Sequence, residues 1–212
     1  MAKPTVVYFP VRALGESIRL TLAAAGVDFV NEAVNKDLLK QDLDTYSFGQ
    51  CPRYYDADVD LVQSHAIVRY LGRKHGLYGS SDIEAARIDQ LLDGMSDLKI
   101  YPLIYLDAMQ TDEARDEYWR NHLEPEAARG SCKGAHMLYV QNFVQKHGKD
   151  GFAVGGKLSI ADIILFNLVD MHKRVFGERF DQAYPALAAH HAKVAALPTV
   201  AAYLAGPNRP AK

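Results

Sequence analysis

The character of the sequence changes at residue 79. Before it, short β-branched and aromatic runs alternate with amphipathic helical stretches; after it, apolar residues recur only at helical spacing. Alternating strands and helices predict a small mixed α/β unit, whereas sustained helical periodicity predicts an all-helical one. We therefore expect a first domain over residues 1–78, a linker over 79–82 and an all-helical domain over 83–212.

The first domain is expected to run βαβ, then an unassigned stretch over residues 36–44, then ββα. Pro10 ends the first strand and Gly26 the first helix, because proline lacks a backbone donor and glycine favours helix ends. The expected elements are strands at 5–9, 27–34, 53–55 and 59–62, and helices at 15–25 and 64–75.

The second domain begins with helical spacing over residues 83–109, where Pro102 is expected to bend one long helix. Ser159 and Asp162 fit a capping box that starts a strongly apolar helix. The tail, residues 205–212, is rich in proline and glycine, so no further helix is expected there. The other helical stretches are 112–147, interrupted near its middle, then 160–176 and 185–204.

The composition excludes several classes of function. The chain has 212 residues, is about half apolar and carries a net charge of −2, without the basic excess that nucleic acids or anionic membranes attract. It shows no signal peptide and no apolar run long enough to span a membrane, so we expect a cytoplasmic protein. Cys51 and Cys132 have neither metal-site nor Cys-x-x-Cys spacing, so we expect no metal and a reducing compartment.

Two fragments predict a site for a small, acidic, peptide-like ligand. In Gln50-Cys51-Pro52, the residue before proline is held extended, so its N–H and C=O are able to pair with a peptide. Gln63 and Ser64 put an amide and a hydroxyl at the start of a helix. The free N–H groups and partial positive charge of a helix start favour a carboxylate.

Further motifs follow in a specific order along nearly the whole chain. They are Tyr8-Phe9-Pro10-Val11-Arg12 and residues 48–52, 61–67, 71–79, 97–98, 103–105 and 158–162. Together they resemble the cytosolic glutathione transferases, most closely the pi class, while residues 16–19 and 22–27 lean towards the alpha class. The resemblance implies a thioredoxin-like domain followed by a helical domain. It also implies a homodimer that conjugates glutathione, as co-substrate, to small hydrophobic electrophiles.

By this resemblance, Tyr8 donates a hydrogen bond to the glutathione sulfur. Lowering a thiol pKa of about 8.5 by about two units requires roughly 2.7 kcal/mol. One hydrogen bond to a charged group contributes about 1.5–3 kcal/mol, so the Tyr8 hydroxyl would supply much of the shift. No Cys-x-x-Cys follows Tyr8, so dithiol exchange is not expected.

The resemblance also implies the other glutathione contacts. The backbone of Cys51, before a cis Pro52, would pair with the cysteinyl unit, and Ser64 would both cap its helix and bind the γ-glutamyl carboxylate. The remaining contacts to the γ-glutamyl end would come from Gln50, from Gln63 and, across the dimer, from Asp97 of the second subunit. Cys51 stands where the family usually has an aliphatic residue, which would add sensitivity to oxidants or alkylators.

The glycyl end of glutathione departs from the family pattern. Pi-class enzymes generally hold it with an arginine, a tryptophan and a lysine. Here Leu14 stands at the arginine position and the only tryptophan, Trp119, lies far along the chain. Lys40 is the nearest lysine, so we expect it to take this role. Glutathione should then bind more weakly than is typical, or another thiol replaces it.

The electrophile pocket and the dimer contact also follow from the resemblance. An apolar pocket would be lined by Phe9, Val11, Leu14, Tyr101 and Tyr105, and left open because the tail forms no lid. Tyr105 would donate to charge that develops on the electrophile. Phe48 would insert between helices of the partner subunit.

Other functions remain open at this point. A glutathione-dependent isomerase or peroxidase would use the same site. A catalytically weak relative, such as a ligand carrier or a lens crystallin, would not need the Tyr8 hydroxyl, although the missing glycyl contacts fit it. The interaction module of a translation elongation factor is a further alternative, but no appended domain is present in the sequence.

Overall fold

The structure is a computed structural model that describes residues 3–130 and 134–211. It divides into two compact units. The sheet unit comprises the residues up to Tyr78 together with those from Ala195 onward, and the helical unit runs from Gly79 to Val194. The sequence division assigned residues 195–212 to the helical domain, whereas the structure groups this segment with the sheet unit.

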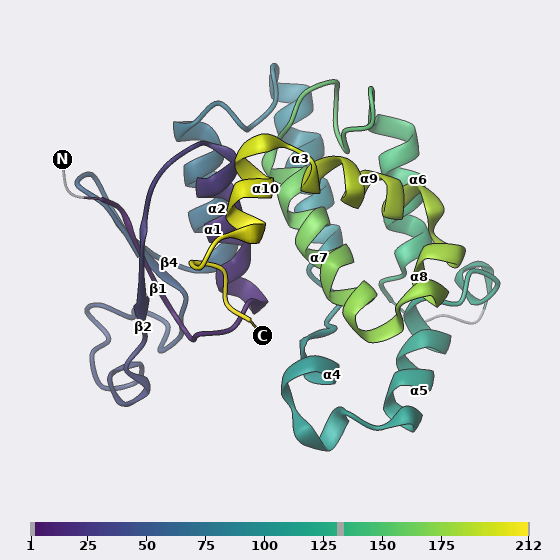
Figure 1. The fold of residues 1–212 in the computed structure, drawn as a ribbon, viewed down its shortest axis with the longest axis horizontal. Helices are drawn as coiled ribbons and strands as arrows, with labels where there is room; N and C mark the ends of the chain where they lie inside the picture. Colours follow the sequence, from purple (N-terminus) through teal and green to yellow (C-terminus); the bar gives the residue numbers. More distant parts are fainter. Residues whose placement is uncertain (1–2, 131–133, 212) are drawn as a thin grey trace. The chain divides into compact units, whose positions relative to one another are not determined.

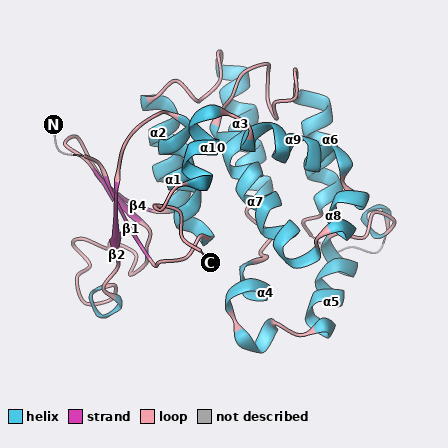
Figure 2. Ribbon diagram, in the orientation of Figure 1, coloured by secondary structure: helices cyan, strands magenta, loops and turns pink. Residues whose placement is uncertain are grey.

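The sheet unit contains a four-stranded mixed sheet in the order β2-β1-β3-β4 (Figures 1 and 2). Strand β1 pairs in parallel with β2 and antiparallel with β3, and β3 pairs antiparallel with β4. The strands are β1 (Thr5–Tyr8), β2 (Val30–Ala33), β3 (Arg53–Tyr55) and β4 (Asp60–Val62). The expected βαβ-ββα order is confirmed, with β2 shorter than its sequence run.

Two helices of the sheet unit pack against one another and bury its core. Helix α1 (Ala13–Ala24) connects the parallel strands and ends before Gly26, whose φ of 69° suits glycine. Helix α2 (Ser64–Lys74) contacts α1, and α10 (Pro198–Ala205) also contacts α1. The fully buried side chains include Ile18, Leu20 and Leu22 of α1, which is buried on nearly all sides, and Ile67 and Leu71 of α2, which lie one turn apart on one face.

The helical unit has no strand among its described residues, although two isolated bridges occur near Gly148. Helix α7 is its most buried element, and the Asp162 carboxylate accepts from the Ser159 N–H at 2.8 Å, which confirms the capping box. Its α-helices are α3 (Asp82–Met95), α4 (Tyr101–Tyr105), α5 (Asp112–His122), α6 (Met137–His147), α7 (Ile160–Phe176), α8 (Glu178–Ala183) and α9 (Pro185–Ala195).

Short 3₁₀ helices complete the described chain. The first, η1 (Lys36–Leu38), lies in the stretch that the sequence left unassigned. The other two are η2 (Asp107–Met109) and η3 (Ala127–Arg129). The last falls in the predicted interruption between α5 and α6, near Gly130.

The prediction of one bent helix over residues 83–109 is wrong. Helix α3 ends at Met95, and residues 96–100 are not helical. Pro102 lies in the first turn of α4, where a missing backbone N–H costs nothing. Proline crowds the turn that precedes it, so it favours a new helix start over continuation of the earlier helix.

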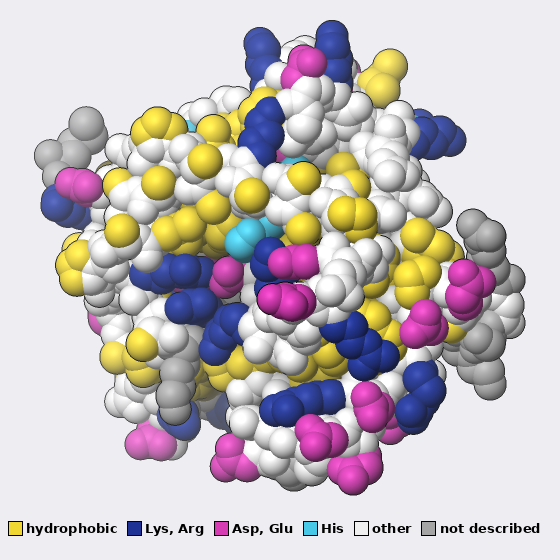
Figure 3. Space-filling model, turned by 45° about the vertical axis from the view of Figure 1, so that its right-hand side comes forward, with side chains coloured by type: hydrophobic (Ala, Val, Ile, Leu, Met, Phe, Trp, Pro, Cys, Tyr) yellow, Lys and Arg dark blue, Asp and Glu magenta, His cyan; other side chains and the backbone are white. Residues whose placement is uncertain are grey.

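The distribution of charged side chains on the surface agrees with the near-neutral net charge of the sequence. Acidic and basic side chains are interspersed on the face drawn in Figure 3, with apolar side chains between them, in keeping with a net charge of −2. None of the helices over residues 3–130 and 134–211 has the length and apolar character needed to cross a membrane.

Candidate active site

Sheet register brings three of the predicted residues to the same edge of the sheet. Tyr8 is the last residue of β1, and its neighbour Val7 pairs with Arg53. Arg53 in turn pairs with Val62 at the end of β4. Pro52 and Gln63, each one residue beyond these pairs, therefore lie at the edge where Tyr8 ends its strand.

The ring of Tyr8 is held from several sides. Tyr8 is only 7% exposed, and its ring meets Phe9 edge to face, with centroids 5.4 Å apart. A β-carbon on Gly15 would lie 2.5 Å from Cδ1 of Tyr8. Helix α1 therefore approaches the ring this closely only because residue 15 is a glycine, which has no side chain. The guanidinium of Arg19 lies 5.9 Å from the ring centroid. The position of Tyr8 is therefore set by packing.

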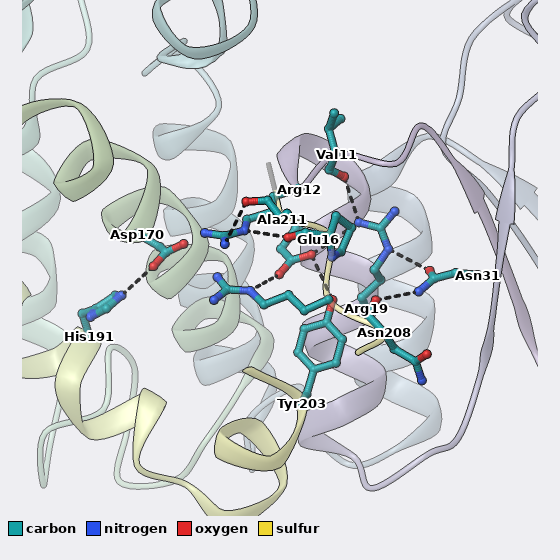
Figure 4. Close-up of polar contacts among 12 residues, drawn as sticks. Val11, Arg12, Glu16, Arg19, Asn31, Asp170, His191, Tyr203, Asn208 and Ala211 are labelled. Atoms are coloured by element: carbon teal, nitrogen blue, oxygen red, sulfur yellow. Dashed lines mark hydrogen bonds and ion pairs between the residues drawn. The ribbon is translucent and has the colours of Figure 1, made fainter. Parts of the chain in front are cut away.

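Arg19 fixes the loop that follows Tyr8. Its guanidinium donates to the carbonyl oxygens of Phe9 and Val11 at 3.3 Å and 3.0 Å. It also donates to Oδ1 of Asn31 at 2.8 Å, and Figure 4 shows Arg19 between Val11 and Asn31. A planar group with five donors suits this set of fixed acceptors, so the loop is tied to both α1 and β2.

A buried carboxylate links this loop to the C-terminal tail. Glu16 is completely buried and accepts from Arg19 at 3.3 Å, from the Tyr203 hydroxyl at 3.0 Å and from Arg209 Nε at 2.9 Å. Burial raises the pKa of Tyr203, and the negative charge of the nearby Glu16 raises it further. The Tyr203 hydroxyl therefore stays protonated and donates a hydrogen bond. These partners compensate a charge that would otherwise be costly to bury.

The tail forms a wall of a cavity next to Tyr8. Asn31 Nδ2 donates to the Asn208 carbonyl at 2.9 Å, and Arg12 Nε donates to the Pro210 carbonyl at 3.1 Å. Residues 206–211 form no helix, as expected, and residues 207–211 line the cavity. The cavity measures about 550 Å³ and is lined by Tyr8, Phe9, Pro10, Arg19, residues 31–33 and residues 207–211.

The predicted γ-glutamyl residues come together at the same edge. Gln63 has φ 73° and ψ 108°, a conformation that costs a non-glycine residue energy and is enriched at functional sites. Its Nε2 donates to Oε1 of Gln50 at 3.2 Å, and both side chains are exposed. The Cys51–Pro52 peptide is cis, as the resemblance implied.

The expectation that Ser64 caps α2 is wrong. Gln63 occupies the N-cap position and its side chain makes no capping hydrogen bond, while Ser64 is the first residue of the helix itself. The left-handed backbone at Gln63 moves the helix start by one residue. Ser64 thereby presents one of the first-turn N–H groups that have no partner inside the helix.

Cys51 differs from the reactive thiol that its departure from the family suggested. It is half-buried, and burial raises the pKa of its thiol to about 11. The thiolate is the form that attacks oxidants and alkylators, so this thiol is little populated in its reactive form near neutral pH.

Of the candidates considered for the glycyl end, only Lys40 lies on the segment after β2. Lys40 is exposed, and its Cγ lies 3.6 Å from a β-carbon built on Gly49, which directly precedes Gln50. Leu14 is half-buried at the start of α1. Trp119 is buried in α5, donates to Glu124 at 2.9 Å and has Arg179 over its ring, so it has a structural role.

Three of the predicted site residues belong to the helical unit. Asp97 is exposed in the turn that follows α3, so it does not lie on a helix as expected. Tyr101 and Tyr105 are both half-buried and stand four residues apart in α4. That spacing puts the two rings on one face of the helix.

Phe48 is a strongly exposed aromatic residue. It is 67% exposed, although the neighbouring Tyr46 is buried. A turn closed by the Gly49 N–H on the Tyr46 carbonyl at 2.7 Å carries Phe48 outward. The Phe48 ring is therefore accessible from solvent.

Two family models match most of the chain. One, described as "Glutathione S-transferase, N-terminal domain", matches residues 4–73, and the other, "Glutathione S-transferase, C-terminal domain", matches residues 100–207. The chain is 36% identical over 208 residues to glutathione S-transferase P of Pongo abelii, covering 96% of this chain and 92% of the relative. The chain belongs to the glutathione S-transferase family.

Further comparisons agree with the family, and a solved structure agrees with the pi-class resemblance. A glutathione S-transferase of Dirofilaria immitis is 34% identical over 203 residues, covering 95% of this transferase and 91% of the relative. The solved structure of the Onchocerca volvulus pi-class glutathione S-transferase superposes with a TM-score of 0.78 at 28% identity, covering 96% and 92% of the two chains. The expected fold, a thioredoxin-like domain followed by a helical domain, is confirmed.

Sequence reasoning missed three residues that shape this transferase's site. Gly15 was assigned only as a helix start and Arg19 only as part of a motif, although an arginine on an apolar helix face signals a buried partner. Lys36, whose Nζ lies 5.3 Å from the Phe9 ring centroid, fell in the unassigned stretch. Over the described residues, no group of three or more His, Cys, Asp or Glu side chains is arranged to hold a metal ion.

Proposed function

We propose that this transferase activates the thiol of glutathione as a thiolate and conjugates it to small hydrophobic electrophiles. The observation that carries the proposal is the register that brings Tyr8, Pro52 and Gln63 to one edge of the sheet, with Gln63 bonded to Gln50 at 3.2 Å. Family membership supports glutathione as co-substrate. The detoxification of reactive compounds is the corresponding physiological role.

Tyr8 is the residue we assign to catalysis. Its hydroxyl would donate to the glutathione sulfur and stabilise the thiolate over the thiol, while the thiol proton leaves to solvent. The thiolate then attacks the electrophilic carbon and either displaces a leaving group or adds to a conjugated double bond. Packing by Gly15 and Phe9 holds the phenol in place before the substrate arrives, which reduces the reorganisation that the reaction needs.

We assign protein residues to each of the three parts of glutathione. The extended Cys51 backbone would pair with the cysteinyl unit, and Lys40 would meet the glycyl carboxylate. The γ-glutamyl end would be held by the side chains of Gln50 and Gln63 and by the hydroxyl and helix-start N–H of Ser64. Asp97 of a second subunit would bind the γ-glutamyl amine.

The electrophile pocket is assigned to apolar and aromatic residues on the resemblance to pi-class enzymes. Phe9, Val11 and Leu14 are half-buried, which leaves apolar surface for a hydrophobic substrate. Tyr101 and Tyr105, on one face of α4, would complete the pocket, and the Tyr105 hydroxyl would donate to developing negative charge. We further propose a homodimer that uses the exposed Phe48, and a cytoplasmic location.

A conjugation assay tests this function directly. The purified protein is mixed with 1-chloro-2,4-dinitrobenzene and glutathione, and separately with cysteine and with γ-glutamylcysteine. Thioether formation that saturates with glutathione is the expected result, and turnover with a different thiol alone would replace glutathione as the co-substrate. Binding of hydrophobic dyes without turnover of any electrophile or hydroperoxide would favour a ligand carrier instead.

A further inference from the structure

Lys36 places a positive charge beside the aromatic residues at the active edge of the sheet. Its Nζ lies 5.3 Å from the centroid of the Phe9 ring, and that ring meets Tyr8 edge to face at 5.4 Å between centroids. The ammonium group is therefore one side chain away from the phenol that we assign to catalysis. The sequence analysis gave Lys36 no role.

The backbone explains why Lys36 is found there. Tyr8 pairs with Ala33 at the end of β2, and the Val34 N–H donates to the Tyr8 carbonyl at 3.1 Å. Asn35 then starts η1 by accepting the Asp37 N–H on its side-chain oxygen at 3.1 Å. Lys36 thus leaves a backbone tied to Tyr8 itself, and its position follows from strand pairing.

The charge of Lys36 is not neutralised by a neighbouring carboxylate. Across residues 3–130 and 134–211, no ion pair with an Asp or Glu side chain involves Lys36, and the side chain is exposed. Contact with the Phe9 ring uses the face of the ring and leaves ammonium N–H donors for another acceptor. Leu14, which by resemblance stands at the position of a pi-class arginine, adds no charge of its own.

We propose that Lys36 gives the electrophile site a preference for aromatic electrophiles that carry a carboxylate or a similar anionic group. The aromatic part would lie against Phe9 and the anionic group would meet the Lys36 ammonium. The inference rests on the proposed function, because Phe9 belongs to the electrophile pocket by resemblance. It names the class of substrate that this pocket would select.

A matched pair of substrates isolates the anionic group. 4-Chloro-3-nitrobenzoate and 4-chloro-3-nitrobenzamide have the same leaving group and nearly the same shape but differ by one charge. In both reactions the glutathione sulfur forms a bond to the ring carbon, the carbon–chlorine bond breaks, chloride leaves and the thiol proton goes to solvent. The ratio of kcat/KM for benzoate to that for benzamide is measured in each protein, so intrinsic reactivity cancels between variants.

Lys36→Met removes the charge and keeps the length of the side chain. We expect it to lower the benzoate-to-benzamide ratio about threefold, the size that a partly exposed ion pair supports. Lys36→Arg should restore the ratio, and Lys157→Met, which removes an exposed lysine of the helical unit, should leave it unchanged. In the unmodified protein, 0.5 M NaCl should reduce the ratio, because salt screens exposed charges.

The outcomes separate this inference from the function on which it rests. Conjugation of the benzamide reports the proposed function, and the ratio reports the role of Lys36. An equal ratio in the unmodified protein and Lys36→Met would overturn the inference while leaving the function intact. A higher KM for glutathione with an unchanged ratio would instead assign Lys36 to the glycyl carboxylate. No conjugation of either compound would overturn both.

Discussion

Gly15 lies so close to Tyr8 that a β-carbon at residue 15 would stand 2.5 Å from Cδ1 and 2.7 Å from Cγ of the tyrosine ring. Real β-carbons do not approach other heavy atoms this closely, so the ring would have to move. The contact joins the first turn of α1 to the last residue of β1. A helix residue that contacts neither substrate therefore sets where the phenol stands.

Gly15→Ala is expected to lower kcat/KM for conjugation tenfold or more. The added methyl group displaces the Tyr8 ring, and the hydroxyl loses its alignment with the thiol. Overpacking of this kind typically costs about 1–3 kcal/mol of stability, which would exceed the gain of up to about 1 kcal/mol that alanine brings to a helix. Kinetics with glutathione and urea unfolding measure the two effects.

Gly94→Ala is the matched control for this substitution. Gly94 lies in α3, is exposed and has no heavy atom within 4 Å of a built β-carbon. Alanine there should stabilise the protein slightly and leave activity unchanged. Equal activity of the two variants would show that Tyr8 does not depend on the glycine beside it.

Tyr8→Phe should reduce turnover by at least an order of magnitude and change glutathione affinity little. The hydroxyl acts on the sulfur, whereas binding comes from the ends of the peptide. Ultraviolet titration of the bound thiol should show its pKa rising towards the free value of about 8.5 in the variant. Identical titration curves for the two proteins would remove Tyr8 from the catalytic role.

Phe48→Ala should shift a dimer towards monomer. The side chain is 67% exposed in the single chain, and burying it in a well-packed pocket of a partner would make its truncation cost about 3–5 kcal/mol. Sedimentation velocity at micromolar concentration measures the change, with Leu43→Ala, another exposed apolar residue of the same segment, as the comparison. An unchanged dimer in Phe48→Ala would assign the contact to other residues.

Much of the fold could be predicted because periodicity reports burial directly. Ile160–Phe176 is apolar on most of its surface, and it forms the most buried helix of the helical unit. The break between α3 and α4 could not be seen, because the apolar spacing continues across residues 96–100 while the backbone does not remain helical. Spacing alone does not distinguish a proline that bends a helix from one that starts the next.

The site was predictable as a set of residues but not as a geometry. Motifs named Tyr8 and Gln63, but only strand register brings them to one edge of the sheet. The left-handed backbone of Gln63 moves the cap from Ser64, and no local sequence rule indicates such a conformation for glutamine. Gly15 and Lys36 act through contacts between separate elements, which a sequence read residue by residue does not report.

The buried His172 predicts how stability changes with pH. Its Nδ1 lies 2.7 Å from the Leu168 carbonyl, which only accepts, so the neutral ring accepts the Tyr118 hydroxyl at Nε2, 3.1 Å away. Burial lowers the pKa of His172 to about 4. At pH values below the ordinary histidine pKa of about 6.5, His172 binds a proton in the unfolded chain but not in the folded protein. Stability therefore falls as the pH falls towards 4.

Between pH 7 and pH 5, this group should lower the free energy of unfolding by about 2 kcal/mol. Urea unfolding at the two pH values measures the loss in the unmodified protein and in His172→Gln, which does not titrate. Other groups contribute equally to both proteins, so the variant should lose less stability over this interval. The same loss in both would mean that His172 is protonated in the folded state.

Leu14→Arg should strengthen glutathione binding by at most several-fold. The glycyl carboxylate carries a full negative charge, and a partly exposed ion pair contributes only about 0.2–1 kcal/mol. Leu14 is half-buried and borders the proposed electrophile pocket, so the new charge should also weaken binding of neutral hydrophobic substrates. Calorimetry measures the dissociation constant of glutathione for the unmodified protein, for Leu14→Arg and for Lys40→Met. The three values compare the contributions of a positive charge at residue 14 and at residue 40. Tight binding by the unmodified protein, with no gain from Leu14→Arg and a marked loss in Lys40→Met, would show that Lys40 already supplies the charge that the arginine provides in the family.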